Sequence, residues 1–202
     1  MERILINIGR QFGSGGRLVA QALGAKLGIP VYDNELIIKA AEESGFSRHL
    51  FARSDEKRNI FSLPSFFSSG QFVVADNHVS DNDLFRIQSD IIRKIAQEGS
   101  AIFIGRCSDY ILREYGCTDV FITAPEEIRV QRVAEREQIP ADEALRLVHT
   151  KDRTRETYYN YFTFGNWGVA SNYDLCLDSS ILGIEATADL IIAFINAKKK
   201  SS

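Results

Sequence analysis

The sequence predicts an α/β protein in which helices cover both faces of a parallel sheet. Three observations carry this prediction: short apolar runs rich in β-branched residues, helical periodicity between those runs, and a glycine-rich turn directly after the first run. Strands buried on both faces are nearly continuous apolar runs, and strands that alternate with helices are typical of three-layer folds. A chain of 202 residues is long enough for one domain that buries about 70% of its surface on folding.

Five segments have the composition of buried strands. They are residues 4–8, 31–32, 101–104, 120–123 and 175–177. The stretches between them, and the last stretch of the chain, carry apolar residues at helical spacing. These are Val19, Leu23 and Leu27; Ile87, Ile91, Ile92 and Ile95; Ile128, Val133 and Ala134; and Ile184, Ala188, Ile191, Ile192 and Ile195. The alternation predicts an open, doubly wound sheet.

The stretch from about residue 47 to 84 departs from this pattern. It is polar and irregular, and it lies in the crossover between the second and third strands. Long irregular segments in compact domains are usually functional or disordered, so we predict an insertion or a mobile subdomain. The alternative is a pair of covering helices with no part in the chemistry. Phenylalanines exposed in such an insertion are suited to a homodimer contact; they are Phe61, Phe66, Phe67 and Phe72.

The composition narrows the classes of function. The chain has 24 Lys and Arg against 27 Asp and Glu, a net charge of −3, so it lacks the basic field of a nucleic-acid-binding protein. Its three cysteines contain no CxxC pair and its three histidines lack zinc-ligand spacing, so we expect reduced thiols and no metal held by protein ligands alone. No uninterrupted apolar run approaches about 20 residues. We therefore expect a cytoplasmic protein without a membrane partner.

The segment from Gly9 to Arg17 carries the strongest chemical signal. Four glycines fall within residues 9–16, between a buried strand and an amphipathic helix. Glycine lets backbone amides approach an anion without obstruction, and the following helix presents its positive end. The segment therefore predicts a phosphate-binding loop. The alternative is a tight strand-to-helix turn that binds nothing.

The type of loop remains open at this point. The pattern GxxxxGK[ST] fails because the segment has no lysine and no hydroxyl residue at the required positions, and GxGxxG fails at Leu18. The pattern GxxxGxG fits Gly9, Gly13 and Gly15, and Asp33 lies where a ribose-binding acid is expected. An NAD(P)-dependent oxidoreductase is therefore an alternative. Against it, no tyrosine is followed by lysine four residues later, as the catalytic pair of such dehydrogenases requires.

Arginines are placed where they would meet a phosphorylated ligand. Arg106 follows the third strand, at the sheet edge where ligands bind in α/β folds, and residues 151–155 contain three cations and one carboxylate. Arg129, Arg132 and Arg136 share one face of a predicted helix. A guanidinium group donates paired hydrogen bonds to phosphate and stays charged. The alternative for the helix arginines is that they are solvated charges paired with Glu126, Glu135 and Glu137.

In this order, the motifs resemble the cytidylate kinase-like family of nucleoside monophosphate kinases. The resemblance covers nearly the whole chain: Gly13-Ser14-Gly15-Gly16-Arg17, Tyr32-Asp33, Gly105-Arg106, the segment 122–129 leading to Arg132, Asp152-Arg153-Thr154-Arg155, and 173–178 with Gly183-Ile184-Glu185. It implies one domain over 1–202, strand order 2-3-1-4-5, an acceptor-binding insertion at about 34–85 and a lid at about 137–168. It also implies transfer of the γ-phosphoryl of ATP, with Mg²⁺, to a small acceptor, most simply CMP.

The resemblance further implies roles for individual residues. The donor nucleotide's phosphate would lie in the loop formed by Gly9, Arg10, Gly13, Ser14, Gly15, Gly16 and Arg17. Asp33 and Arg106 would flank the acceptor, which Asp152 and Arg155 would also contact. Arg17, Arg132, Arg153 and Arg155 would neutralise the transferred group.

One departure from the family pattern affects the expected activity. Gly15-Gly16-Arg17 stands where cytidylate kinases proper carry Gly-Lys-Gly followed by Thr, so the chain resembles a divergent branch. We expect Arg17 to replace the charge of the lysine. Because the loop lacks both lysine and hydroxyl, a nucleotide-binding protein with degenerate or regulatory activity is the second candidate.

Overall fold

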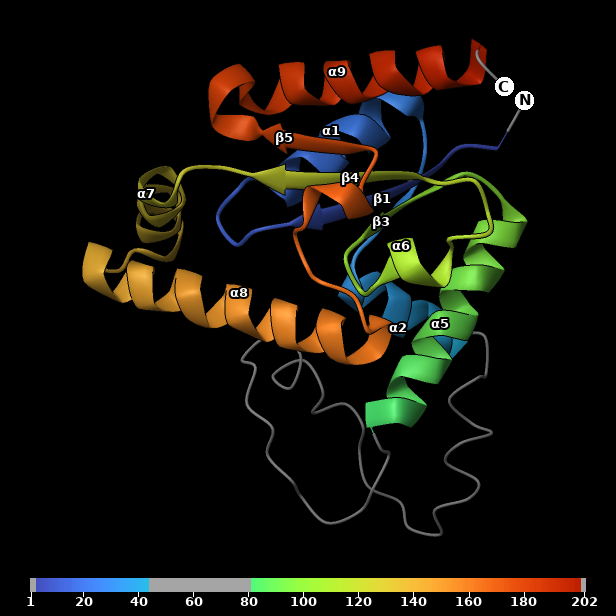
Figure 1. Cartoon of the computed structure of the whole chain (residues 1–202), viewed down its shortest axis with the longest axis horizontal. Coiled ribbons are helices and arrows are strands. Elements are labelled where there is room, and N and C mark those ends of the chain that lie inside the picture. The colour runs from blue at the N-terminus through green and yellow to red at the C-terminus, as the bar shows by residue number, and fades with distance from the viewer. Residues whose placement is uncertain (1–2, 44–80, 201–202) are drawn as a thin grey trace, which may run out of the picture.

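The computed structural model describes residues 3–43 and 81–200 and contains one five-stranded parallel sheet (Figure 1). The strands are β1 (Leu5–Arg10), β2 (Val31–Tyr32), β3 (Ala101–Ile104), β4 (Thr118–Thr123) and β5 (Leu175–Asp178). Their order is β2-β3-β1-β4-β5, and every neighbouring pair is parallel. The predicted fold class and strand order are confirmed, and the predicted strands form with their ends shifted by at most two residues.

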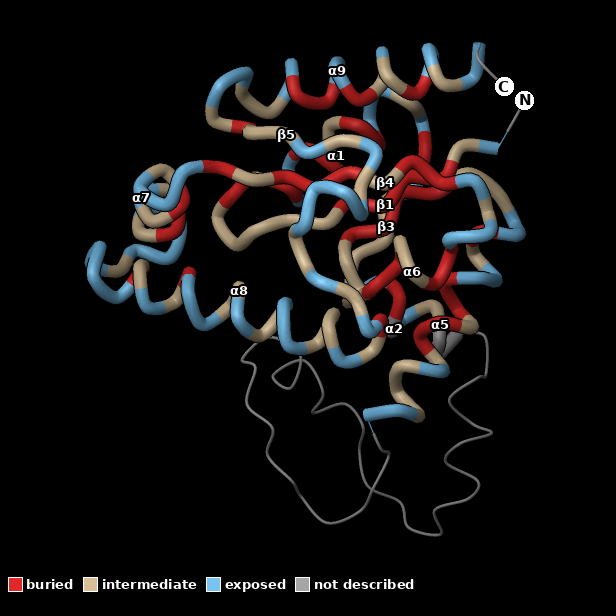
Figure 2. Tube along the Cα trace, viewed as in Figure 1, coloured by how far each residue is buried: buried red, intermediate tan, exposed pale blue. Residues whose placement is uncertain are grey.

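Helices form a layer on each face of the sheet (Figure 1). The described helices are α1 (Gly16–Leu27), α2 (Asn34–Glu43), α5 (Asp81–Glu98), α6 (Ser108–Ile111), α7 (Glu126–Glu137), α8 (Ala141–Thr163), the 3₁₀ turn η2 (Ala170–Asn172) and α9 (Ser179–Lys200). Each face of the sheet has its own hydrophobic core, and alternate residues of β1 belong to different cores. Ile6 and Ile8 pack with α1 and α9, whereas Leu5 packs with α2, α5 and α6. The three central strands, β3, β1 and β4, are mostly buried between these layers (Figure 2).

The structure corrects one boundary of the irregular stretch. Residues 81–84 are the first turn of α5, and Asp81 and Asp83 lie there, where carboxylates favour the positive end of a helix. Residues 47–80 and their phenylalanines lie outside the described residues, so the insertion and the homodimer contact stay predictions.

Helix α9 has the length and mean hydropathy of a membrane span, in contrast to the expectation from apolar runs. It is the one such helix among the described residues. However, Gly183 has φ 76° and ψ 174°, so a kink separates the first turn from the rest. Ala188, Ile191 and Ile195 are buried in the core beside α1. Its apolar face is therefore used to cover the sheet.

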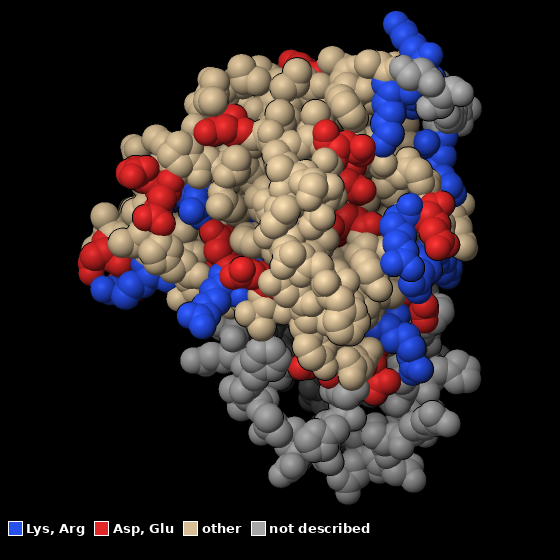
Figure 3. All heavy atoms as spheres, viewed as in Figure 1, with Lys and Arg blue, Asp and Glu red and all other residues tan. Residues whose placement is uncertain are grey.

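Basic and acidic side chains are interspersed on the face of the molecule in Figure 3. Among the ion pairs of the described residues, Lys26 lies 2.6 Å from Asp189 and 3.1 Å from Glu185.

A polar pair between the buried Asn7 and the half-buried Asp119 lies in the middle of the sheet. The side-chain amide of Asn7 in β1 donates to Asp119 Oδ1 in β4 over 2.6 Å. Burial raises the pKa of Asp119 to about 6, and the carboxylates of Asp109 and Asp174 add to the shift, while the Asn7 hydrogen bond and Lys198 oppose it. The ionised form of Asp119 therefore destabilises the fold at neutral pH.

We predict that Asp119→Asn stabilises the protein increasingly as the pH rises. A carboxyl group with a raised pKa in the folded state stabilises the fold below its unfolded-state pKa, and this stability is lost as the pH rises through about 6. Asparagine keeps the acceptor for Asn7 and does not ionise. Between about pH 5 and pH 8, the stability of the variant relative to the natural chain should grow by about 1 kcal/mol. Urea unfolding measures this difference.

The control is Asp142→Asn, which removes an exposed carboxylate of α8 paired with Arg146. Its effect should stay well under about 1 kcal/mol at both pH values. A pH-independent effect of Asp119→Asn would contradict a half-buried Asp119 carboxylate whose pKa is raised to about 6.

Candidate active site

The glycine-rich segment forms a closed loop that leads into α1. Gly13 and Gly15 both have φ 80°, a left-handed conformation that favours glycine. Ser14 is fully buried, and its hydroxyl donates to the Gln11 carbonyl over 2.8 Å. No described residue accepts a hydrogen bond from the amides of residues 15–17. The loop thus presents unpaired amides at the positive end of a helix, which is an arrangement suited to an anion.

A cavity of about 1850 Å³ opens at the carboxyl edge of the sheet. It is lined by residues from the loop, from the starts of α1 and α2, from the end of β3, and from α7 and α8. These include Gly9, Arg10, Gly13, Gly15, Gly16, Arg17, Asp33, Arg106, Arg132, Arg153 and Arg155. The structure therefore brings together all the predicted site residues except Ser14 and Asp152, which do not line the cavity.

Arg106 lies on a strained connection between β3 and α6. Gly105, Arg106 and Cys107 have φ values of 67°, 63° and 56°, which are uncommon for residues other than glycine. The Arg106 Nε donates to Asn34 Oδ1 over 2.7 Å, and its guanidinium lies 5.3 Å from the Tyr158 ring centroid. Burial lowers the pKa of Arg106. The strained backbone directs this guanidinium toward α2 and α8, on the acceptor side expected from the sequence.

Arg155 extends from α8 to the start of the loop. Its Nη1 donates to the carbonyl of Arg10 over 3.0 Å, and its guanidinium lies 5.3 Å from the Phe12 ring centroid. Burial lowers the pKa of Arg155 to about 10, and the charges of Arg136 and Arg129 contribute, while Asp152 opposes them. A guanidinium held in this way favours the approach of an anion.

Arg17 and Asp33 form an ion pair at the cavity wall. Arg17 Nη2 lies 2.8 Å from Asp33 Oδ2, and the Arg17 side chain is 61% exposed. The other Asp33 oxygen accepts from the Leu36 N–H over 3.2 Å, so Asp33 caps α2. The roles of Arg17 at the phosphate and of Asp33 at the acceptor stay predictions.

Arg132 and Arg153 approach the cavity from two different helices. Arg132 of α7 donates to Ser179 Oγ over 3.0 Å, and the Ser179 hydroxyl donates to the Ser14 carbonyl. Arg132 is therefore fixed beside the loop. Arg153 is an exposed residue of α8 and lines the cavity.

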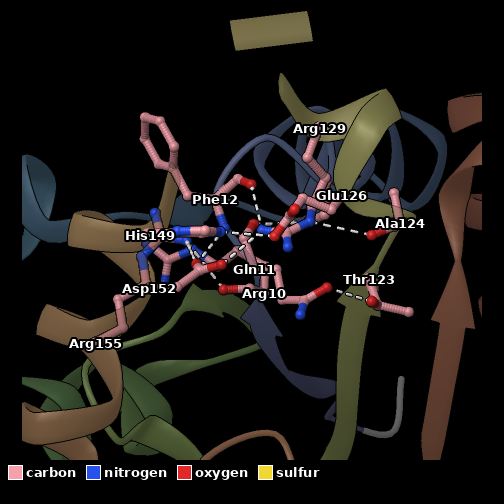
Figure 4. A network of polar contacts seen from close by, with 11 residues as sticks. Arg10, Gln11, Phe12, Thr123, Ala124, Glu126, Arg129, His149, Asp152 and Arg155 are labelled. Atoms are coloured by element: carbon pink, nitrogen blue, oxygen red, sulfur yellow. Dashed lines mark hydrogen bonds and ion pairs between the residues drawn. The ribbon is translucent and has the colours of Figure 1, made fainter. Parts of the chain in front are cut away.

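Asp152 joins the loop to α7 and α8 (Figure 4). Its Oδ1 accepts from the Phe12 N–H over 2.6 Å, and its Oδ2 accepts from Arg129 Nη1 over 2.6 Å. Arg129 also donates to the carbonyls of Phe12 and Ala124 over 3.2 Å and 3.1 Å. Both Asp152 oxygens are thus engaged within the protein, and its contact with an acceptor stays a prediction.

The interpretation of Arg129 as a solvated charge is wrong. Its side chain is 7% exposed, and Glu126 pairs with His149 at 2.7 Å (Figure 4). A sequence signal for this burial was present, because Arg129 precedes Val133 by one helical turn on the apolar face of α7. Asn34 and Tyr158 were also missed; Asn34 directly follows Asp33 in sequence, whereas nothing local indicates that Tyr158 meets Arg106.

The fold and site define a class of protein. A parallel sheet of order 2-3-1-4-5 with a glycine-rich loop between β1 and α1 is the architecture of P-loop kinases. The shikimate kinase of Bacteroides thetaiotaomicron shares this fold, with 11% identity, a TM-score of 0.56, and coverage of 96% of this chain and 99% of that structure. An uncharacterized protein from Eubacterium ventriosum is more similar, with 28% identity, a TM-score of 0.74 and the same coverage.

Residues 5–181 match the cytidylate kinase-like family, and the chain belongs to that family. Its relatives include the cytidylate kinase of Methanopyrus kandleri, 26% identical over 96% of this chain and 93% of the relative. The cytidylate kinase of Pyrobaculum islandicum is 23% identical over 95% and 92%. Family and fold together support a nucleotide kinase and leave the NAD(P)-dependent oxidoreductase without support.

We predict that Arg129→Met destabilises the protein by about 3 kcal/mol, because it removes the buried guanidinium that forms the shortest ion pair of the half-buried Asp152 carboxylate. The matched control is Arg146→Met, which removes a 71% exposed guanidinium of α8 and should cost less than about 1 kcal/mol. Urea unfolding of both variants measures the difference. Equal effects would show that the Arg129–Asp152 pair does not hold the loop to α7 and α8.

Proposed function

We propose that the protein transfers the γ-phosphoryl of ATP to a small phosphorylated acceptor, and that CMP is this acceptor. The single observation that carries the proposal is the convergence of Arg10, Arg106 and Arg155 on one cavity with the glycine-rich loop. These residues come from β1, the β3–α6 connection and α8, which are far apart in sequence. CMP is favoured because the relatives from Methanopyrus kandleri and Pyrobaculum islandicum are cytidylate kinases.

The donor nucleotide would place its polyphosphate in the loop. The unpaired amides of residues 15–17 and the helix α1 dipole suit phosphate oxygens. Arg132 beside Gly15 and Arg153 on α8 would add positive charge near the terminal phosphate. In phosphoryl transfer the protein acts mainly by positioning the reactants and by neutralising the charge on the transferred oxygens.

The acceptor would bind between β3, α2 and α8. Arg106 would hold its phosphate, because a guanidinium forms paired hydrogen bonds with phosphate oxygens. Asn34 orients Arg106 through the Nε contact, and the Tyr158 ring supports it. Asp33, directly before α2, would flank the acceptor.

The described residues do not fit a resident magnesium site. They contain no cluster of three or more His, Cys, Asp or Glu side chains placed to ligate a metal. The buried Ser14 hydroxyl donates to the Gln11 carbonyl. We propose that Mg²⁺ enters with the nucleotide, since Mg²⁺ is commonly held by substrate phosphates and water.

A nucleotide-binding protein with regulatory activity is the second candidate. The observation that favours it is the loop itself, which has Gly16 and Arg17 where kinases carry Lys and a following small residue. Loss of such a lysine reduces transition-state stabilisation unless another cation replaces it.

The test is ADP formation from ATP with CMP, with UMP and shikimate as comparison acceptors. The natural chain should form ADP with CMP well above the solvent background. Arg106→Met and Arg155→Ala should each lower kcat/KM about 100-fold or more, because each removes a cation from phosphate. Arg93→Met, on the exposed surface of α5, is the matched control and should keep full activity.

Two outcomes would contradict the kinase proposal. If the protein binds ATP but forms no ADP with any of the three acceptors, the regulatory alternative is favoured. If Arg106→Met and Arg155→Ala both keep full turnover, the arginines do not form the site.

A further inference from the structure

The structural reason for glycine at position 16 differs from the reason at positions 13 and 15. Gly13 and Gly15 have φ 80°, whereas Gly16 is not among the residues with positive φ. Its backbone would therefore accept a side chain. However, a Cβ at position 16 would lie 2.6 Å from Arg10 Cβ and 3.0 Å from Arg10 Cγ. The stem of the Arg10 side chain thus fills the space in which a side chain of residue 16 would begin.

A second glycine makes room for the other end of Arg10. A Cβ at Gly105 would lie 1.8 Å from Arg10 Nη1. The Arg10 side chain therefore runs from the end of β1, past the start of α1, to the β3–α6 connection. Along this path it lines the cavity between the loop and Arg106. Two glycines from distant segments thus enclose one arginine.

The Arg10 guanidinium has no counter-ion among the described residues. None of these residues accepts a hydrogen bond from the guanidinium, and none forms an ion pair with it. Burial lowers the pKa of Arg10 well below its ordinary range, and the charges of Arg155, Arg106 and Arg17 lower it further, while Asp33 opposes them. A cation placed among other cations in a cavity favours the binding of an anion there.

We propose that Arg10 supplies the positive charge that phosphate loops ordinarily take from a lysine at the position of Gly16. Arginine at the end of β1 and glycine at the start of α1 then form one exchange: the cation approaches the phosphate from the strand instead of from the helix. The ligand is the polyphosphate of a nucleoside triphosphate, so this inference rests on the proposed function. It also reassigns the charge expected of Arg17, because Arg17 is paired with Asp33 and is largely exposed.

Variants at positions 10 and 16 can distinguish a charge-supplying role of Arg10 from a merely structural role. ATP affinity is measured by calorimetry on the natural chain, Arg10→Met, Gly16→Lys and the double variant Arg10→Gly with Gly16→Lys, in which no Cβ of residue 10 obstructs the new side chain. Arg10→Met keeps the length of the stem and removes the charge, so ATP should bind roughly 10- to 100-fold more weakly. Gly16→Lys alone places its Cβ against Arg10 and should also weaken binding.

The double variant removes the obstructing stem and returns a cation to the position of Gly16. It should recover ATP affinity to within a few-fold of the natural chain. Arg93→Met is the matched control and should bind as the natural chain does. Urea unfolding of each variant, together with Arg10→Lys, which keeps the charge and should keep most of the affinity, separates lost binding from lost folding.

The outcomes distinguish this inference from the proposed function. If the natural chain does not bind ATP, the proposed function fails and the inference fails with it. If the natural chain binds ATP and Arg10→Met binds it equally well, only the inference about Arg10 is overturned. If Arg10→Met loses affinity but the double variant does not recover it, Arg10 is a structural residue, and the exchange with Gly16 is likewise overturned.

Discussion

The carboxylate of Asp152 is the contact on which the arrangement of the site depends. It accepts hydrogen bonds from the Phe12 amide and from Arg129, so it ties the glycine-rich loop to α7 and α8 at once. Arg155 lies three residues later on α8. Because Asp152 holds α8 against the loop, the Arg155 guanidinium reaches the Arg10 carbonyl. Without the Asp152 contact, the arginines of α8 would not be fixed over the loop.

The same arrangement concentrates positive charge. Arg10, Arg106 and Arg155 all have lowered pKa values, with burial as the largest cause for each. Like charges brought together in this way destabilise a fold unless an anion binds. The positive φ values of residues 105–107 add backbone strain at the same site. Both features are understandable in a site whose ligand carries several phosphates.

The architecture was predictable because it depends on local patterns. Buried parallel strands are continuous apolar runs, and the helix faces follow from spacing; the order of the strands came from the resemblance to a family. The rule that ligands bind at the carboxyl ends of parallel strands placed the loop and Arg106 at one edge. Each strand and helix could be inferred from residues that are neighbours in sequence.

Other parts of the site could not be predicted because they depend on contacts between distant segments. Arg129 and Asp152 are 23 residues apart, and only the packing of α7 against α8 makes them a pair. The contact between Arg10 and position 16 depends on the path of the Arg10 side chain. Gly16 lies among several other glycines, so the sequence does not indicate this contact. Nothing local to Tyr158 shows that its ring lies against Arg106.

A crystal structure with CMP and a non-hydrolysable analogue of ATP tests the proposed site most directly. The polyphosphate should lie within the turn of residues 13–17, with the guanidiniums of Arg10 and Arg155 within hydrogen-bond distance of its oxygens, and a second phosphate should lie at Arg106. An empty turn, with these guanidiniums directed to solvent, would contradict a phosphate-binding role of the loop and its arginines.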